Sequence, residues 1–166
     1  LGDYGLKLDE ENLGKEYTVS AWVKPDGTLA ENQNVLFLGY HNPEKWLAVS
    51  GKKTGTNTCK IWENGNGYKW STFWSPEIDT EGWHNITLSG KSGQVTAYVD
   101  GIKLGTHDSN DPLDGENQGI YLGVTNWDAE FEGLVDEVNV YDIALTEKEV
   151  QEQNKADYTQ ILQEKL

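Results

Sequence analysis

Residues 131–150 read FEGLVDEVNVYDIALTEKEV, and this stretch contains both kinds of secondary structure that the chain predicts. β-Branched and aromatic residues recur over Gly133–Tyr141, which predicts a β-strand. Thr146 and Glu149 then have the spacing of a capping box, so a helix is predicted to begin at about Glu147. The chain is therefore expected to end in a strand followed by a helix.

Upstream of this stretch, short alternating runs separated by Gly, Asn, Asp and Pro extend from residue 17 to about residue 141. Tyr17–Val23 alternates and stops at Pro25-Asp26-Gly27, a turn sequence. Lys91-Ser92-Gly93 and Asp100-Gly101 mark tight hairpins. Short strands separated by such turns predict an antiparallel all-β fold. Further strands are predicted over Asn34–Tyr40, Lys45–Val49, Thr58–Glu63, Tyr68–Phe73, Trp83–Ser89, Gln94–Asp100, Ile102–Thr106 and Gly119–Val124.

The composition restricts the possible partners. The 166 residues suit a single domain, and the single cysteine, Cys59, excludes an intramolecular disulfide. The formal net charge is −15 and the chain has no arginine. Nucleic acid, anionic lipid, sialic acid and polyuronate are therefore poor ligands, because they are bound through Lys and Arg. No segment approaches the roughly 20 apolar residues of a membrane span. The alternative is that the acidity only keeps a secreted protein soluble.

Three segments, Tyr17–Pro25, Trp83–Ile102 and Phe131–Val150, together resemble the laminin-G-like and concanavalin-A-like lectin-glucanase superfamily. The resemblance is to the variety appended to bacterial glycoside hydrolases. It implies two packed antiparallel sheets in a jelly-roll β-sandwich over residues 1–145. Residues 146–166 are then expected to form a short C-terminal helix or linker.

Seven Trp and eight Tyr against three Phe is an unusual balance, and such rings suit the faces of sugars as well as protein cores. Trp22 and Trp83 match positions that are structural in the family, so both are predicted to be core residues. The other rings, with polar neighbours, concentrate in Tyr40–Trp74 and at Asn126-Trp127. Each of these residues has an alternative role in the core. The predicted ligand-binding residues are Tyr40, His41, Trp46, Trp62, Tyr68, Trp70, Asn126 and Trp127.

The resemblance also implies a structural calcium ion, which needs hard oxygen ligands that converge from separate segments. Asp136 matches the family position on the last long strand, and Asp9 and Glu11 are plausible partners near the N-terminus. Asp136 is favoured because an unpaired charge between Val135 and Val138 would be costly to bury. The alternative is that these acids are solvated or cap backbone groups.

Catalysis is not expected. Asp128, Glu130 and Glu132 would share one face of a strand, as the paired carboxylates of glycosidases do. In the family that the chain resembles, however, the corresponding segment leads into the final strand and lies at the rim of the sandwich. The three histidines are scattered, and no nucleophile and base are paired in the sequence.

The sequence thus predicts a non-catalytic carbohydrate-binding module that recognises a neutral polysaccharide or glycan. The resemblance implies an ancillary domain of a larger glycoside hydrolase, monomeric and secreted or at the cell surface, which holds the linked catalytic domain against its substrate. Two alternatives belong to other classes: an interaction or spacer domain that binds no sugar, and a small glucanase.

Overall fold

The computed structural model describes residues 5–8, 12–27, 31–39, 45–51, 59–64, 69–74, 78, 80–116, 118–123 and 129–163, with the backbone alone over 59–64, 69–74 and 162. Within these residues the elements are β1 (Leu6–Leu8), β2 (Glu16–Pro25), β3 (Asn34–Gly39), β4 (Trp46–Gly51), β5 (Cys59–Asn64), β6 (Lys69–Trp74), β7 (His84–Lys91), β8 (Gln94–Val99), β9 (Ile102–Asp108), β10 (Gly119–Leu122), β11 (Gly133–Tyr141) and α1 (Glu147–Gln163).

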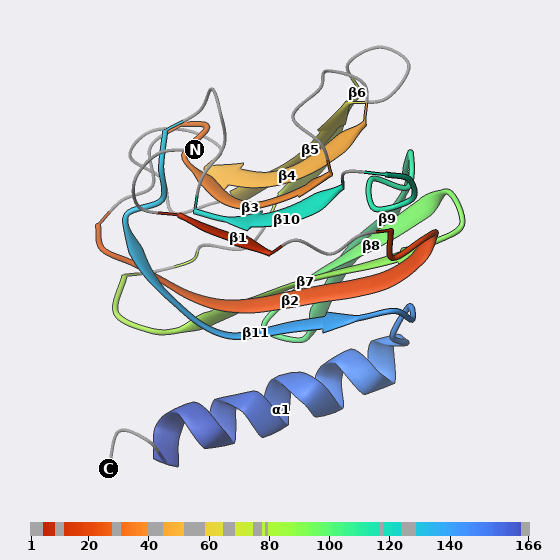
Figure 1. Ribbon diagram of the computed structural model, residues 1–166. Coiled ribbons are helices and arrows are strands. Elements are labelled where there is room, and N and C mark those ends of the chain that lie inside the picture. Colours follow the sequence, from red (N-terminus) through yellow and green to blue (C-terminus); the bar gives the residue numbers. More distant parts are fainter. Residues whose placement is uncertain are drawn as a thin grey trace.

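The strands form two antiparallel sheets that face each other, and α1 lies outside one of them (Figure 1). A six-stranded sheet has the order β1-β10-β3-β4-β5-β6, and a five-stranded sheet has the order β11-β2-β7-β8-β9. The predicted all-β sandwich with a C-terminal helix is confirmed. Strand β1 was not predicted, because three residues are too few to show a period.

Both predicted hairpins are present. Ser92 and Gly93 have φ values of 42° and 84°, and Asp100 and Gly101 have 52° and 75°. Two successive positive φ angles define the type I′ turn, which matches the twist of the strands that it joins. The β7–β8 and β8–β9 connections are therefore fixed by local sequence.

Aliphatic side chains fill the space between the sheets. Along β2, alternate residues from Tyr17 to Val23 point inward and join Ile86 and Leu88 of β7. They meet residues of the six-stranded sheet such as Leu36 and Leu47, which are at most 1% exposed. These contacts supply most of the apolar burial that holds the sheets together.

The opposite face of the five-stranded sheet is buried as well along β2 and β7, and α1 lies outside this sheet (Figure 1). Several of the buried side chains on this face are polar and have hydrogen-bond partners. Thr18 donates to the carbonyl oxygen of Ile143 at 2.8 Å and accepts from the backbone N–H of Leu145 at 2.9 Å. Ser89 donates to the carbonyl oxygen of Leu145 at 2.9 Å. The sheet and the entry to α1 are therefore joined by paired polar groups.

Helix α1 begins at the predicted capping box. The Thr146 backbone N–H and hydroxyl both donate to Glu149 Oε2 at 2.7 Å, and Thr146 Oγ1 accepts from the Glu149 N–H at 3.4 Å. Val150 and Ile161 are each 1% exposed. Within the described residues, no helix combines the length and the apolar character needed to cross a membrane.

Trp22 is 2% exposed, which confirms its predicted burial, but its ring lies against α1 instead of between the sheets. Trp83 was also predicted to be a core residue, and it is only half-buried, just before β7. The alternation of side chains along a strand predicts which residues share a face. It does not predict that a helix far away in the sequence covers one of the two faces. The two tryptophans therefore have different environments despite the same predicted role.

A buried carboxylate, Asp157, joins α1 to the sheet. Its Oδ2 accepts from Trp22 Nε1 and from Asn139 Nδ2, each at 3.4 Å, and its Oδ1 accepts from Gln153 Nε2. The side chain is 5% exposed. Burial raises the pKa of Asp157 above its usual value, and the hydrogen bonds from Trp22 and Gln153 partly offset this effect.

This environment predicts a pH dependence that Asp157→Asn removes. Because the pKa is higher in the folded state, Asp157 favours folding most below its unfolded pKa of about 3.9, and this contribution falls as pH rises through the folded pKa. The variant should therefore gain stability relative to the native chain between about pH 4 and neutrality. Urea unfolding at a series of pH values measures the difference. Asp142→Asn, an exposed site after β11, is the control, and parallel curves for the native chain and Asp157→Asn would contradict the prediction.

Candidate functional site

The outer face of the six-stranded sheet carries a group of aromatic side chains. Leu47 and Val49 of β4 join the core between the sheets, so the alternating residues Trp46, Ala48 and Ser50 belong to the opposite face. Trp46 and Ala48 form a second apolar cluster with Phe37 of β3 and Tyr121 of β10. We call Phe37, Trp46, Ala48 and Tyr121 the outer cluster.

The rings of the outer cluster are packed together and buried. Phe37 and Trp46 stack with centroids 5.7 Å apart and planes at 25°, and Tyr121 meets Phe37 edge-on, also at 5.7 Å. Lys7 of β1 places its Nζ 5.8 Å from the centre of the Tyr121 ring, within the range of a cation–π contact. Trp46 and Tyr121 are each 4% exposed. The outer cluster is thus a preorganised aromatic layer at the base of this face.

Two polar side chains lie at one end of the same face. Asn34 and Ser50 are directly opposite each other in the β3–β4 ladder, and both residues are 0% exposed. Among the described residues, neither the side-chain amide of Asn34 nor the hydroxyl of Ser50 has a hydrogen-bond partner. An unpaired buried polar group costs about 1–3 kcal/mol, and no described residue uses the hydrogen-bonding capacity of these two side chains. Sequence reasoning missed both residues, because isolated Asn and Ser carry no pattern.

The segment with the predicted rim residues Asn126 and Trp127 is attached at this end of the sheet. The N–H of Gly123 donates to the carbonyl oxygen of Val35 at 2.9 Å, and the N–H of Asn34 donates to that of Ala129 at 2.9 Å. Both ends of the intervening segment are therefore fixed beside the start of β3. The described ends of this segment therefore lie beside the six-stranded sheet, whereas Asn126 and Trp127 themselves lie outside the described residues.

The other predicted ligand residues are only partly described. Trp62 is the Cα partner of Ala48 in the β4–β5 ladder, so its position belongs to the outer face, and Trp70 lies in β6. Trp46 has a packing role against Phe37, and its part in ligand binding stays a prediction. The remaining residues lie outside the described residues: Tyr40, His41, Tyr68, Asn126 and Trp127.

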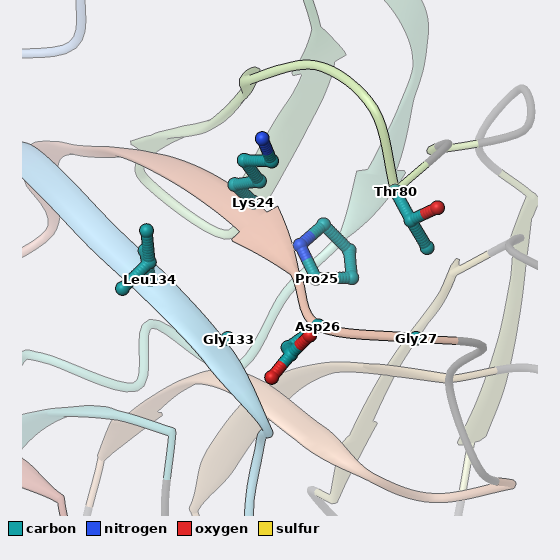
Figure 2. A pocket seen from close by; sticks show the side chains of 7 residues that line it. All are labelled: Lys24, Pro25, Asp26, Gly27, Thr80, Gly133 and Leu134. Carbon is teal, nitrogen blue, oxygen red and sulfur yellow. The ribbon is translucent and has the colours of Figure 1, made fainter.

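A pocket of about 500 Å³ opens at the rim, where β2 ends and β11 begins. Figure 2 shows Lys24, Pro25 and Asp26 of one segment beside Leu134 of β11, with Thr80 across from them. A Cβ at Gly133 would collide with the carbonyl oxygen of Lys24, so this close approach requires glycine. Gly27 completes the lining. The pocket offers an ammonium, a carboxylate and a hydroxyl to a small polar ligand, and no sequence motif indicated it.

The predicted metal ligand Asp136 lies on β11, the last long strand, where the resemblance places it. Of the two valines that favoured it, Val135 is 37% exposed and Val138 packs against the core, so Asp136 is half-buried and its role as a metal ligand stays a prediction. Asp136 Oδ1 accepts the N–H of Glu137 at 2.9 Å, at a bulge where Glu137 has a φ of 44°. The described residues contain no group of three His, Cys, Asp or Glu side chains that could hold a metal ion. Asp9 and Glu11 lie outside the described residues.

The acidic segment considered for catalysis lies at the rim, as predicted. Asn34 and Glu130 form an isolated bridge, and the carbonyl oxygen of Glu130 accepts from Gln33 Nε2 at 2.8 Å. Glu132 is exposed just before β11, and Asp128 is outside the described residues. Glu130 is therefore attached beside the start of β3, whereas the carbonyl oxygen of Glu132 accepts the N–H of Asp26 at 2.9 Å, just after β2. Neither residue lies within a strand of the outer face.

Comparisons with known proteins agree with this architecture. The family model for the concanavalin A-like lectin/glucanases superfamily matches residues 2–151. The chain belongs to this superfamily. No curated protein matches it significantly. Among solved structures, the superfamily fold recurs in domain 4 of AbnA, a GH43 extracellular arabinanase from Geobacillus stearothermophilus, solved in complex with arabinotriose. That structure has a TM-score of 0.72 and 30% sequence identity, over 89% of this chain and 71% of the other.

Two more distant structures share the superfamily fold. The CBM40 of Ruminococcus gnavus IT-sialidase, bound to α2,3-sialyllactose, has a TM-score of 0.65 and 14% identity over 92% of this chain and 97% of the other. Domains LG4-5 of the mouse laminin α1 chain have a TM-score of 0.60 and 15% identity over 87% of this chain and 40% of the other. At these identities the likeness concerns the fold alone.

The packing of Trp46 predicts that Trp46→Ala destabilises the protein. Loss of a large buried ring from a packed cluster costs about 3–5 kcal/mol of unfolding free energy, here because Phe37 loses its stacking partner. Chemical denaturation followed by circular dichroism measures this loss. Trp46→Phe keeps a ring at the position and should cost less. An unchanged denaturation midpoint for Trp46→Ala would show that the ring is not structural.

Proposed function

We propose that this protein is a non-catalytic carbohydrate-binding module that recognises a neutral oligosaccharide on the outer face of the six-stranded sheet. One observation carries the proposal: a preorganised aromatic layer lies on the same face as Asn34 and Ser50, whose buried polar atoms are unpaired among the described residues. Sugars present C–H faces to aromatic rings and hydroxyls to amides and hydroxyls. This combination fits a sugar better than a purely apolar ligand.

The similarity to the arabinanase domain supports a specific choice of ligand. That domain is 30% identical to this chain and was solved with arabinotriose, an uncharged oligosaccharide. A neutral ligand also suits a chain with a net charge of −15 and no arginine, because no guanidinium is present to pair with a carboxylate. An arabino-oligosaccharide is therefore the first ligand to test, with galactan and β-glucan oligosaccharides next.

The biological role that follows is the targeting of a linked glycoside hydrolase, at the cell surface or outside the cell. A tethered module raises the local concentration of substrate around its enzyme, even when its own affinity is weak. The competing role is that of a spacer or interaction domain, and the low exposure of the outer cluster favours that alternative. Sugar binding distinguishes the two roles.

The proposal predicts that arabinotriose binds and that outer-face variants weaken it. Ser50→Ala should reduce binding and leave stability unchanged or higher, because it removes an unpaired buried hydroxyl. Trp62→Ala and Trp127→Ala should each cost about 1–3 kcal/mol of binding free energy through lost stacking. Isothermal titration calorimetry with each variant, together with a thermal melt, measures both effects.

Ile102→Ala, at a 64% exposed position on the other sheet, is the matched control and should bind as the native chain does. Raising the salt concentration should change the affinity little, since a neutral ligand makes few ionic contacts. Native affinity in Ser50→Ala, Trp62→Ala and Trp127→Ala would refute the site. Failure to bind any neutral oligosaccharide would favour the spacer role.

A structural calcium ion is a separate proposal, supported only by the place of Asp136 on the last strand, with Asp9 and Glu11 as its expected partners. Binding to the folded state alone raises stability by about 2.7 kcal/mol at a hundredfold excess over Kd. Chelator should therefore lower the melting temperature, and Asp136→Ala should abolish this difference, whereas Asp142→Ala should not. If protein first saturated with calcium has the same melting temperature with and without chelator, the proposal of a structural calcium ion is wrong.

A further inference from the structure

A second hollow lies between α1 and the five-stranded sheet, which is not the sheet that carries the outer cluster. Its volume is about 400 Å³, within the usual range for small-ligand sites. It forms where the helix passes the start of β7 and the β8–β9 turn. We call it the helix groove, and its lining residues are Trp22, Trp83, His84, Asp100, Asn154, Lys155 and Tyr158.

Aromatic rings form the apolar part of the helix groove. Trp22 and Tyr158 stack with centroids 5.7 Å apart and planes at 27°. Trp22 is 2% exposed and forms the floor, whereas Tyr158 is 47% exposed and Trp83 is half-buried. A large exposed ring on an otherwise polar helix presents a face that a ligand can cover.

The polar groups of the helix groove are held on rigid elements. Asp100 Oδ2 lies 2.9 Å from His84 Nδ1, and Asp100 Oδ1 accepts the N–H of Asn85 at 2.8 Å. Asp100 also belongs to the type I′ turn, where its own N–H donates to the carbonyl oxygen of Asn85 at 2.9 Å. The carboxylate and imidazole therefore keep fixed positions beside the rings, as an oriented binding site requires.

Asn154 adds an unused acceptor from the helix. Its Oδ1 is buried and has no hydrogen-bond partner among the described residues. Its side chain packs against the turn, because a Cβ at Gly101 would come within 3.3 Å of Asn154 Nδ2. A donor that reaches this oxygen would relieve the cost of an unpaired buried polar atom.

From these contacts we propose that the helix groove is a second glycan-binding site, which takes one neutral sugar residue against Tyr158 and Trp83. The inference rests on the proposed function, since it assumes that the chain binds neutral sugars. Asp100 and Lys155 contribute opposite charges, so the lining has no strong bias towards a charged ligand. Rings supply a stacking face, and Asn154 and Asp100 supply acceptors for hydroxyl groups.

Two sites on different sheets would let one module hold two chains, or two segments of one chain, of a polysaccharide. Binding at the second site then becomes intramolecular, and the apparent affinity for polymer exceeds the affinity for a short oligosaccharide. Because the two sites lie on different sheets, binding of a short oligosaccharide at the helix groove can be measured separately from binding at the outer face.

The test is an NMR titration of the full chain with arabinotriose. Amide signals of Gly101 and Asn154 report the helix groove, and those of Asn34 and Ser50 report the outer face. In the native chain both sets should shift. In Tyr158→Ala the groove signals should need about tenfold more arabinotriose, whereas Tyr158→Phe, which keeps the ring, should stay within about threefold of the native chain. The signals of Asn34 and Ser50 should shift as before in both variants.

Because Tyr158 also packs on Trp22, Asn154→Ala provides a variant without that contact and should weaken the groove response alone. Thr159→Ala, an exposed neighbour on α1 outside the groove lining, should match the native chain. If the signals of Asn34 and Ser50 shift while those of Gly101 and Asn154 do not, this inference is overturned and the proposed function is unaffected. Native groove shifts in both Tyr158→Ala and Asn154→Ala would also overturn it. Signals that stay fixed in both sets would contradict the inference and the proposed function together.

Discussion

Strand β2 is covered on both faces, and the rest of the molecule is arranged around this constraint. Its inward residues meet the six-stranded sheet, while Thr18, Ser20 and Trp22 lie beneath α1. A polar group that loses water must find a protein partner, or the burial costs free energy. Loop carbonyls after β11, the amide of Asn85 and the carboxylate of Asp157 provide these partners. The helix is therefore an integral layer of the described structure, and its register on the sheet is set by hydrogen bonds as well as by Val150 and Ile161.

The same arrangement explains where the aromatic side chains lie. Among the described residues, the fully buried cluster between the sheets is aliphatic except for Tyr17. Trp22 and Trp46 instead lie on opposite outer faces of the sandwich, one under α1 and the other in the outer cluster. Trp22 lies beside the carboxylate of Asp157 and the exposed ring of Tyr158, whereas Trp46 packs among the buried side chains of Phe37, Ala48 and Tyr121. The two faces that carry these rings are the two candidate binding surfaces, and on the side of α1 the ring of Tyr158 is exposed and that of Trp83 is half-buried.

Much of the fold could be predicted from the sequence, because its signals are local. The type I′ turn at Asp100-Gly101 and the capping box at Thr146 depend on a few adjacent residues, and both are confirmed. The candidate site was harder to predict, because burial depends on distant segments. Trp83 had a core pattern and is half-buried beside the helix, and Asp136 is half-buried because Val135 is exposed while Val138 packs against the core. Asn34 and Ser50 could not be identified at all, since their importance arises only from facing each other across β3 and β4.

The polar groups on the two outer faces differ in one physical respect that bears on function. Beneath α1, Asn85 donates to Ser20 at 2.8 Å and Thr87 donates to Asn85 at 2.6 Å, so buried polar atoms pair with one another. On the six-stranded sheet, Asn34 and Ser50 are buried to the same degree, yet their side chains pair with none of the described residues. Contacts with the described residues give this second arrangement no compensation for its desolvation cost, which apolar residues of similar size would avoid. A ligand with hydroxyl groups can supply the missing partners. The contrast therefore distinguishes the face that packs against a helix from the face on which we propose that a ligand binds.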